Sequence, residues 1–228
     1  MKFERSYPKY EIQIPSSKEK IYFRPFLVSD EKNLLLIKEE KNPSLIIKNV
    51  LELIQKCFFD ISIDEITLQD LEFLFCNLRA KSIGEIVKTN FTCPVTQEKI
   101  KTTVNLTELE LGKSNKEFTI KLSDDYTIKF KQPTIIKILS IDGNFDIDHM
   151  IKSSIDLISK GDSVYSFNDL SSSDMNEIIS TLTKKEFNEI KDFVMNLPKC
   201  HSNVKYTTSD NIERTLRLDG VLNFFTLA

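Results

Sequence analysis

The 228-residue sequence lacks any long apolar run, and no stretch approaches the ~20 residues that a membrane span requires. It also lacks an apolar segment near its start, where "MKFERSYPKYEIQIP" is mixed and polar, so we expect a protein that is not exported. Basic residues are not in excess, because 31 Lys and Arg stand against 34 Asp and Glu, which gives a net charge of −3. With no basic stripe either, we expect no nucleic-acid partner.

Residues and motifs that carry out catalysis are equally scarce. The sequence has two histidines and four cysteines, and it contains no G-x-x-x-x-G-K-[ST], G-x-G-x-x-G, H-E-x-x-H or G-x-S-x-G. Cys57 and Cys76 lie on apolar helix faces and are expected to be small core residues. Cys200 and His201 are adjacent in sequence, and adjacent side chains seldom point at each other. We therefore expect no catalytic residues, no enzyme and no cofactor, and thiols that stay reduced.

The composition and the hydrophobic patterns of the sequence indicate a folded α+β protein. Hydrophobic residues make up 40% of the chain and charged residues 29%, which is typical of a globular domain. Period-two patterns predict short strands in "EIQIP" and "KIYFRPF" and in four segments between residues 84 and 133, the last two joined across Asp124 and Asp125. The tail "NVKYTTSDNIERTLRLDGVLNFF" alternates in the same way and predicts a final hairpin.

Helical spacing of apolar residues predicts the other elements. Three amphipathic helices are expected in "SDEKNLLLIKEE", in "NPSLIIKNVLELIQKCFF" with Asn42 as its cap and Pro43 at its first position, and in "TLQDLEFLFCNLRAKS". Helices are expected again in "TIIKILS", "FDIDHMIKSSIDLISK", "SSSDMNEIISTL" and "TKKEFNEIKDFVMNLP". In the last of these, Thr183 and Glu186 have the spacing of a capping box.

These patterns divide the chain into four segments. Residues 1–28 form an extended N-terminal arm, and residues 29–83 form an N-terminal helical unit. Residues 84–132 form an antiparallel β unit, which is inserted before the C-terminal helical unit of residues 133–228, itself closed by a hairpin. The fold class is therefore α+β, with helical bundle parts around β-ribbons.

The stretch "FTCPVTQEKIKTTVNL", residues 91–106, begins like half of a zinc ribbon. A structural zinc site takes four ligands, commonly from two C-x2-4-C knuckles. Here Thr96 stands where the second cysteine of a C-x-x-C pair would be, and the segment after Cys200 and His201 contains no further cysteine. Cys93, Cys200 and His201 are thus weak candidates for metal ligands, and we expect ribbon-like hairpins without a metal.

Several residues near the termini and at one helix end suit contacts with another protein. Aromatic and arginine side chains are frequent anchors in buried interfaces, and the candidates here are Phe23, Arg24, Phe26, Arg79, Lys81, Phe224 and Phe225. The alternative is that they complete the protein's own core, or that Arg79 and Lys81 close a helix.

The segments "IYFRPFLVSDEKNLLLIKEE", "LEFLFCNLRAKSIGE", "FTCP" and "LRLDGVLNFF" resemble, in that order, the T4-type bacteriophage baseplate protein family. The resemblance covers nearly the whole chain. It implies a non-enzymatic protein, made in the host cytoplasm, that acts in assembly of the baseplate hub, either as a virion subunit or as a chaperone. Its partners would be other hub or tail proteins, and an oligomer is compatible with this role.

Some members of this family carry additional cysteines in the β-ribbon segments, a pattern from which Thr96 departs. Two alternatives of other classes stay open. The first is a zinc-ribbon-like regulatory or interaction module. The second is a cell-wall hydrolase, for which Asp146, Asp148 and His149 are the residues to test, although His149 is expected to be solvated or to cap a helix.

Overall fold

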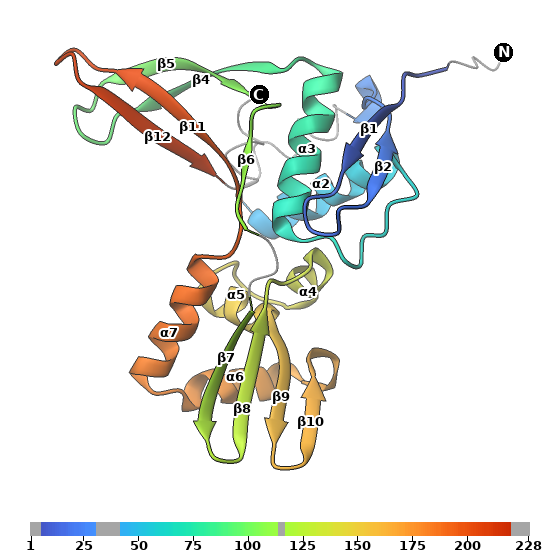
Figure 1. Ribbon diagram of the computed structural model, residues 1–228, viewed down its shortest axis with the longest axis vertical. Coiled ribbons are helices and arrows are strands. Elements are labelled where there is room, and N and C mark those ends of the chain that lie inside the picture. Colours follow the sequence, from blue (N-terminus) through green and yellow to red (C-terminus); the bar gives the residue numbers. More distant parts are fainter. Residues whose placement is uncertain (1–5, 31–41, 114–116, 220–228) are drawn as a thin grey trace. The chain divides into compact units, whose positions relative to one another are not determined.

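The computed structural model describes residues 6–30, 42–113 and 117–219 (Figure 1). The protein is α+β, as the sequence patterns predicted. Its chain forms two compact units, each described separately below. Unit 1 comprises Met1–Ser62, Gln69–Leu111 and Lys199–Ala228, and unit 2 comprises Ile63–Leu68 and Gly112–Pro198. Over the described residues, no helix is both long enough and apolar enough to cross a membrane.

The N-terminal part of unit 1 is a β-hairpin extended by a third strand. Strands β1 (Tyr10–Gln13) and β2 (Lys20–Phe23) pair antiparallel, and β3 (Phe58–Phe59) adds to the other edge of β2. The register sets Phe23 opposite Phe58, and their rings stack with centroids 4.9 Å apart. The strands expected in the N-terminal arm are therefore present, and a small sheet holds them.

Helix α2 (Pro43–Cys57) begins as the sequence predicted. The Asn42 side-chain oxygen accepts hydrogen bonds from the amides of Ser44 and Leu45 at 3.0 and 3.4 Å, which caps the first turn. One face of the helix is buried, and its residues are Ile46, Ile47, Val50, Leu51, Leu53, Ile54 and Cys57. Cys57 is fully buried, so its prediction as a core residue is confirmed.

Helix α3 (Leu68–Ser82) buries polar as well as apolar side chains. Its predicted apolar face is confirmed, because Leu71, Leu74, Phe75 and Leu78 are at most 2% exposed. The Asp70 carboxylate accepts hydrogen bonds from the Ser16 amide at 2.9 Å and the Ser16 hydroxyl at 2.7 Å. Ion–amide bonds of this kind are short and strong when buried. Asp70 therefore fixes the N-terminal hairpin to α3.

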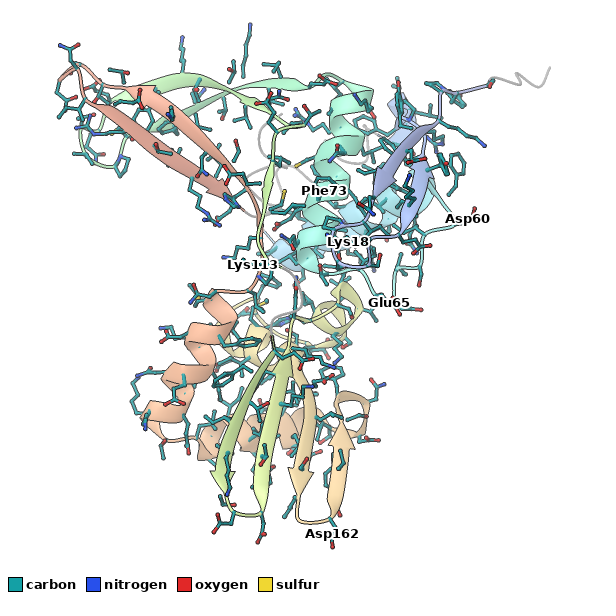
Figure 2. The ribbon with its side chains drawn as sticks, in the orientation of Figure 1. Lys18, Asp60, Glu65, Phe73, Lys113 and Asp162 are labelled. Carbon is teal, nitrogen blue, oxygen red and sulfur yellow. The ribbon has the colours of Figure 1, made fainter. Side chains whose placement is uncertain are left out.

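Two β-ribbons complete unit 1. Strand β4 (Ile86–Thr92) pairs with β5 (Lys99–Asn105), and β11 (Cys200–Thr207) pairs with β12 (Glu213–Asp219). The short strand β6 (Glu110–Leu111) pairs with the beginning of β11. Their shared cluster with α3 consists of Cys76, Ala80, Val87, Val104, Leu106, Cys200 and Val204, against which Phe73 packs (Figure 2). The final hairpin and the core position of Cys76 were both predicted correctly.

Unit 2 is built on a four-stranded antiparallel sheet. Its strands β7 (Glu117–Ser123), β8 (Tyr126–Lys131), β9 (Ile155–Lys160) and β10 (Ser163–Ser166) follow the order β10-β9-β8-β7. The hairpin predicted across Asp124 and Asp125 is β7–β8. The sequence pattern predicted one β unit over 84–132, whereas the β4–β5 and β7–β8 hairpins belong to separate sheets in separate units.

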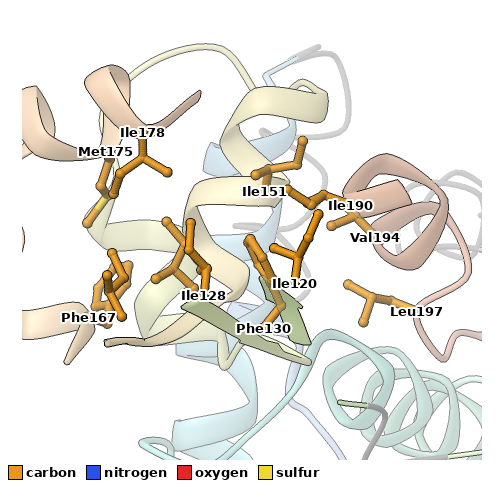
Figure 3. Close-up of a cluster of buried hydrophobic side chains, with 12 residues drawn as sticks. Ile120, Ile128, Phe130, Ile151, Phe167, Met175, Ile178, Ile190, Val194 and Leu197 are labelled. Atoms are coloured by element: carbon orange, nitrogen blue, oxygen red, sulfur yellow. The ribbon is translucent and has the colours of Figure 1, made fainter. Parts of the chain in front are cut away.

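Helices cover one face of this sheet (Figure 1). They are α5 (Ile147–Ser154), α6 (Ser172–Thr181) and α7 (Lys184–Met195), while α4 (Ile135–Ser140) precedes α5 and the short 3-10 turn η1 (Phe167–Asp169) precedes α6. The core between helices and sheet is shown in Figure 3 and contains Ile120, Ile128, Phe130, Ile151, Ile155, Ile158, Phe167, Met175, Ile178, Ile190, Val194 and Leu197. One packed face is the usual arrangement for an antiparallel sheet.

The helix predicted for residues 145–160 is wrong in its second half. Helix α5 ends at Ser154, and the chain continues as β9. The Ser153 and Ser154 hydroxyls both donate to the Met150 carbonyl, which satisfies a carbonyl at the end of the helix. Ile155 then turns extended, and β9 pairs with strands on both of its sides. The local sequence pattern at residues 155–160 fits a helix as well as a strand, and pairing with the neighbouring strands decides for the strand.

Candidate functional site

The tip of the β4–β5 hairpin is built around Cys93. The Cys93 amide donates to the Glu98 carbonyl at 2.8 Å, and the Gln97 amide donates to the Cys93 carbonyl at 2.9 Å, which closes a tight turn. The Thr96 amide is directed at the Cys93 sulfur, 3.5 Å away. Thr96 therefore occupies the position of a second knuckle cysteine, as the sequence indicated, and contacts the sulfur through its backbone.

The tip of the β11–β12 hairpin lies against this turn. The Tyr206 hydroxyl is 3.3 Å from the Cys93 sulfur, and the Tyr206 ring meets the edge of Phe91 with centroids 4.9 Å apart. The Glu98 carboxylate accepts hydrogen bonds from the Ser209 amide at 3.1 Å and the Ser209 hydroxyl at 2.6 Å. The two hairpin tips are therefore joined by hydrogen bonds and a ring contact.

Arg214 closes the second tip. Its Nη1 donates to the Thr208 hydroxyl, to Asp210 Oδ1 at 2.9 Å and to the Ile212 carbonyl at 3.2 Å, and its Nη2 donates to Asp210 Oδ2 at 2.6 Å. This two-pronged pair holds the pKa of Asp210 well below its usual range. Arg214 thus supplies a fixed positive charge to a turn that lacks the cysteines of a zinc knuckle.

The Cys93 thiol differs from the other three. Burial alone would raise its pKa, but the donors that face the sulfur, Thr96 and the Tyr206 hydroxyl, lower its pKa to about 7. Burial raises the pKa of Cys57 to about 11, and it raises the pKa of Cys76 and Cys200 as well. Cys93 is nevertheless fully buried, so the geometry offers no approach for a substrate.

The three weak metal-ligand candidates do not converge. Cys200 and His201 begin strand β11, six and five residues before Tyr206, which corresponds to about 15–20 Å along a strand. The Cys200 amide donates to Glu72 at 2.9 Å, and His201 Nε2 lies 3.4 Å from Glu110. In the ranges 6–30, 42–113 and 117–219, no group of three or more His, Cys, Asp or Glu side chains could hold a metal ion.

Two of the three residues of the hydrolase alternative, Asp146 and His149, have local structural roles. The Asp146 carboxylate accepts the His149 amide at 3.0 Å and so caps α5. His149 was expected to be solvated or capping, but its side chain is 3% exposed and its Nε2 donates to the Ile138 carbonyl at 2.8 Å. Packing between α4 and α5 buries this ring, a contact that the local sequence does not reveal.

The candidate partner contacts fall into two groups. Phe23, Phe26 and Arg79 are 2%, 9% and 7% exposed, and thus lie inside unit 1. Arg24 is half-buried, and its guanidinium donates to the carbonyls of Pro25 at 2.9 Å and Lys56 at 3.1 Å.

Lys81 is exposed, pairs with Glu85 at 2.6 Å, and lies over the Tyr10 ring. Phe224 and Phe225 lie outside the described residues. Tyr206, Glu98 and Arg214 were not among the candidates from the sequence, because their contacts join or close hairpin turns that come together only in the fold.

The contacts between the two hairpin tips and the buried clusters are features that hold the fold together. The chain matches the model of the family described as T4 bacteriophage base plate protein over residues 7–226 and belongs to that family. Similar chains were found neither among the curated proteins nor among the solved structures. A baseplate family implies a structural, non-enzymatic role in the phage tail and contacts with other tail proteins.

Proposed function

We propose that this protein acts in assembly of the baseplate hub of a contractile-tail phage, through protein–protein contacts and without catalysis. The observation that carries the proposal is the family match over residues 7–226. It is supported by the internal use of the reactive or charged side chains: Cys93 contacts the second hairpin tip, Arg214 closes the turn of that tip, and Asp146 caps a helix. The proposal includes both a permanent hub subunit and an assembly chaperone that leaves.

The face around the N-terminal sheet is a proposed contact surface. Lys81 would meet an acidic partner directly, because its side chain is exposed. Phe23, Phe26 and Arg79 would act from behind this surface by holding its shape, and Arg24 would do so by tying the "RPF" turn to the end of α2. Phe224 and Phe225 stay proposed contacts from the sequence alone.

Quantitative mass spectrometry on purified mature phage and on tail-assembly intermediates from infected cells tests the proposal. A fixed whole-number ratio to the other hub proteins in mature particles supports a subunit. Presence in intermediates together with absence from particles supports a chaperone. Absence from both preparations would overturn the baseplate-assembly proposal.

A second comparison separates this proposal from the zinc-module alternative. If a metal held the ribbon tips, the purified protein would contain about one zinc per chain, and a chelator would unfold unit 1. Under our proposal the side-chain bonds of Glu98 and Arg214 hold the tips, so chelator treatment leaves the unfolding transition unchanged. Turnover of peptidoglycan by the purified protein would instead revive the hydrolase alternative.

A further inference from the structure

Unit 2 contains an open pocket of about 450 Å³ beside the core face of its sheet. The register places Tyr126 opposite Lys160 and Ile158 opposite Tyr165, so these four side chains share one face of strands β8, β9 and β10. Ile158 is buried under α6, whereas Tyr165 is 41% exposed. The pocket therefore has an apolar floor, continuous with the core, and two tyrosine rings in its lining.

Two of the carboxylates that line the pocket are fixed in place. Asp169 Oδ2 accepts the amide and the hydroxyl of Ser166, both at 2.7 Å. Asp174 Oδ2 accepts the amide and the hydroxyl of Ser171, at 2.8 and 2.6 Å. These bonds hold the pKa of both aspartates below their usual values, so both are ionised at neutral pH. All four bonds end on Oδ2, and no other described residue makes a hydrogen bond to either Oδ1.

Glu177 adds a third carboxylate, and Lys160 is the one lysine in the lining. The pocket therefore carries an excess of negative charge. Burial, and then the charges of Glu177 and Asp174, raise the pKa of Tyr126, so these two carboxylates act on the tyrosine that shares the lining with them. An occupant that complements this lining is a cation, and the tyrosine rings add a favourable surface for a flat one.

The size and arrangement of the pocket select the kind of cation. These carboxylates do not form a group that could hold a single metal ion, because no such group of three or more acidic, His or Cys side chains exists among residues 117–219. The volume, about 450 Å³, exceeds what one side chain fills and suits a side chain together with the segment that carries it. A guanidinium pairs with carboxylates through two parallel bonds and stacks on aromatic rings, which an ammonium does not do as well.

We propose that this pocket binds an arginine side chain carried by a segment of another baseplate protein. The choice of a tail protein as partner rests on the proposed function, whereas the choice of arginine rests on the carboxylates, the tyrosines and the volume. The guanidinium would meet the free oxygens of Asp169 and Asp174 and the Glu177 carboxylate, with its flat face toward Tyr126 or Tyr165.

The test uses the full-length protein with isotope-labelled tyrosine and short peptides as probes. The first peptide is Gly-Gly-Arg-Gly-Gly, and the second contains citrulline, a neutral analogue of the same shape, in place of arginine. A single side chain binds weakly, with a Kd on the order of 1 mM. We expect saturable shifts of the Tyr126 and Tyr165 signals with the arginine peptide and none with the citrulline peptide.

Two variants test whether the arginine peptide binds in this pocket. The double change Asp174→Asn with Glu177→Gln keeps an acceptor for the α6 cap and removes two charges, so we expect the affinity to fall about tenfold. The matched control is Glu189→Gln on the exposed face of α7, which should leave the affinity unchanged. No saturable shift, equal binding of the citrulline peptide, or an unaffected double variant would each overturn the arginine pocket.

A phage carrying the double variant separates this inference from the proposed function. If the wild-type protein is found in tail intermediates or particles and the folded variant is found there at the same level, the pocket proposal fails while the assembly role stands. If the wild-type protein is found in neither, the assembly role fails, whatever the peptides show.

Discussion

At the scale of single residues, the ribbon tips show how side-chain bonds can take the place that a metal has in zinc ribbons. Arg214 binds three acceptor residues on its own turn, and Glu98 reaches from one hairpin to Ser209 on the other. A metal would join the tips through four deprotonated ligands. Here the positive charge is the guanidinium of Arg214, which stays protonated over the whole physiological pH range.

Cys93 gives a prediction at this scale. In a titration followed by thiolate absorbance, we expect one thiolate to form with a pKa of about 7, because the pKa values of Cys57, Cys76 and Cys200 are all raised by burial. Tyr206→Phe removes a donor to the sulfur and should move this transition to higher pH.

Cys93→Ser serves as the control, since it should abolish the transition and leave the others in place. A wild-type protein without any thiolate signal below about pH 8.5, the usual pKa of a free cysteine, would show that the donors do not act on Cys93 as the structure indicates.

At the scale of elements, helices α6 and α7 of unit 2 begin with reciprocal caps. Thr183 N and Oγ1 donate to the Glu186 carboxylate, both at 2.7 Å, and the Glu186 amide donates back to Thr183 Oγ1 at 3.3 Å. The predicted capping box of α7 is therefore confirmed. Ser171 and Asp174 make the same arrangement at α6, where Asp174 also lines the pocket.

The cap of α7 is testable. Thr183→Ala removes the side-chain bonds and should lower the free energy of unfolding by about 1 kcal/mol, measured by denaturant titration. Asn188→Ala is the matched control on the exposed face of the same helix, where alanine is a better helix former, so no loss is expected. A loss for Asn188→Ala as large as that for Thr183→Ala would mean that the cap contributes nothing specific.

Elements with strong local signals were predictable from the sequence. The cap and first proline of α2, the capping box of α7 and the β7–β8 hairpin depend on neighbouring residues, and each is present. Strand β9 was predicted as helix because its extended form depends on pairing with β8, from a distant part of the sequence, and with β10, which follows it across a tight turn. The pocket was not predictable either, since its tyrosines and carboxylates meet only after this sheet has formed.

At the scale of the whole molecule, each unit contains its own buried cluster. Ile128 belongs to the cluster of unit 2, and Val204 belongs to that of unit 1. A substitution that leaves a cavity in a buried cluster mainly destabilises the cooperative unit that contains the cluster. Such substitutions should therefore show whether the two units unfold separately.

We therefore expect Ile128→Ala to destabilise unit 2 by about 2–5 kcal/mol. In hydrogen exchange followed by mass spectrometry, amides of β7, β8 and β9 should exchange faster while those of β4, β5 and β12 keep their protection. Val204→Ala is the reciprocal variant and should give the opposite pattern. Equal acceleration in both units after either change would mean that they unfold as one.

The insertion of Gly112–Pro198 into unit 1 has a consequence for the order of events on the ribosome. Val87, Val104 and Leu106 leave the ribosome long before Cys200 and Val204, with which they share a cluster. At about 5–20 residues per second, the inserted segment takes on the order of ten seconds to translate. During that interval unit 2 can finish folding while the β4–β5 ribbon still waits for its partner strand, so a nascent chain stalled before β11 would expose this apolar face to chaperones and to aggregation.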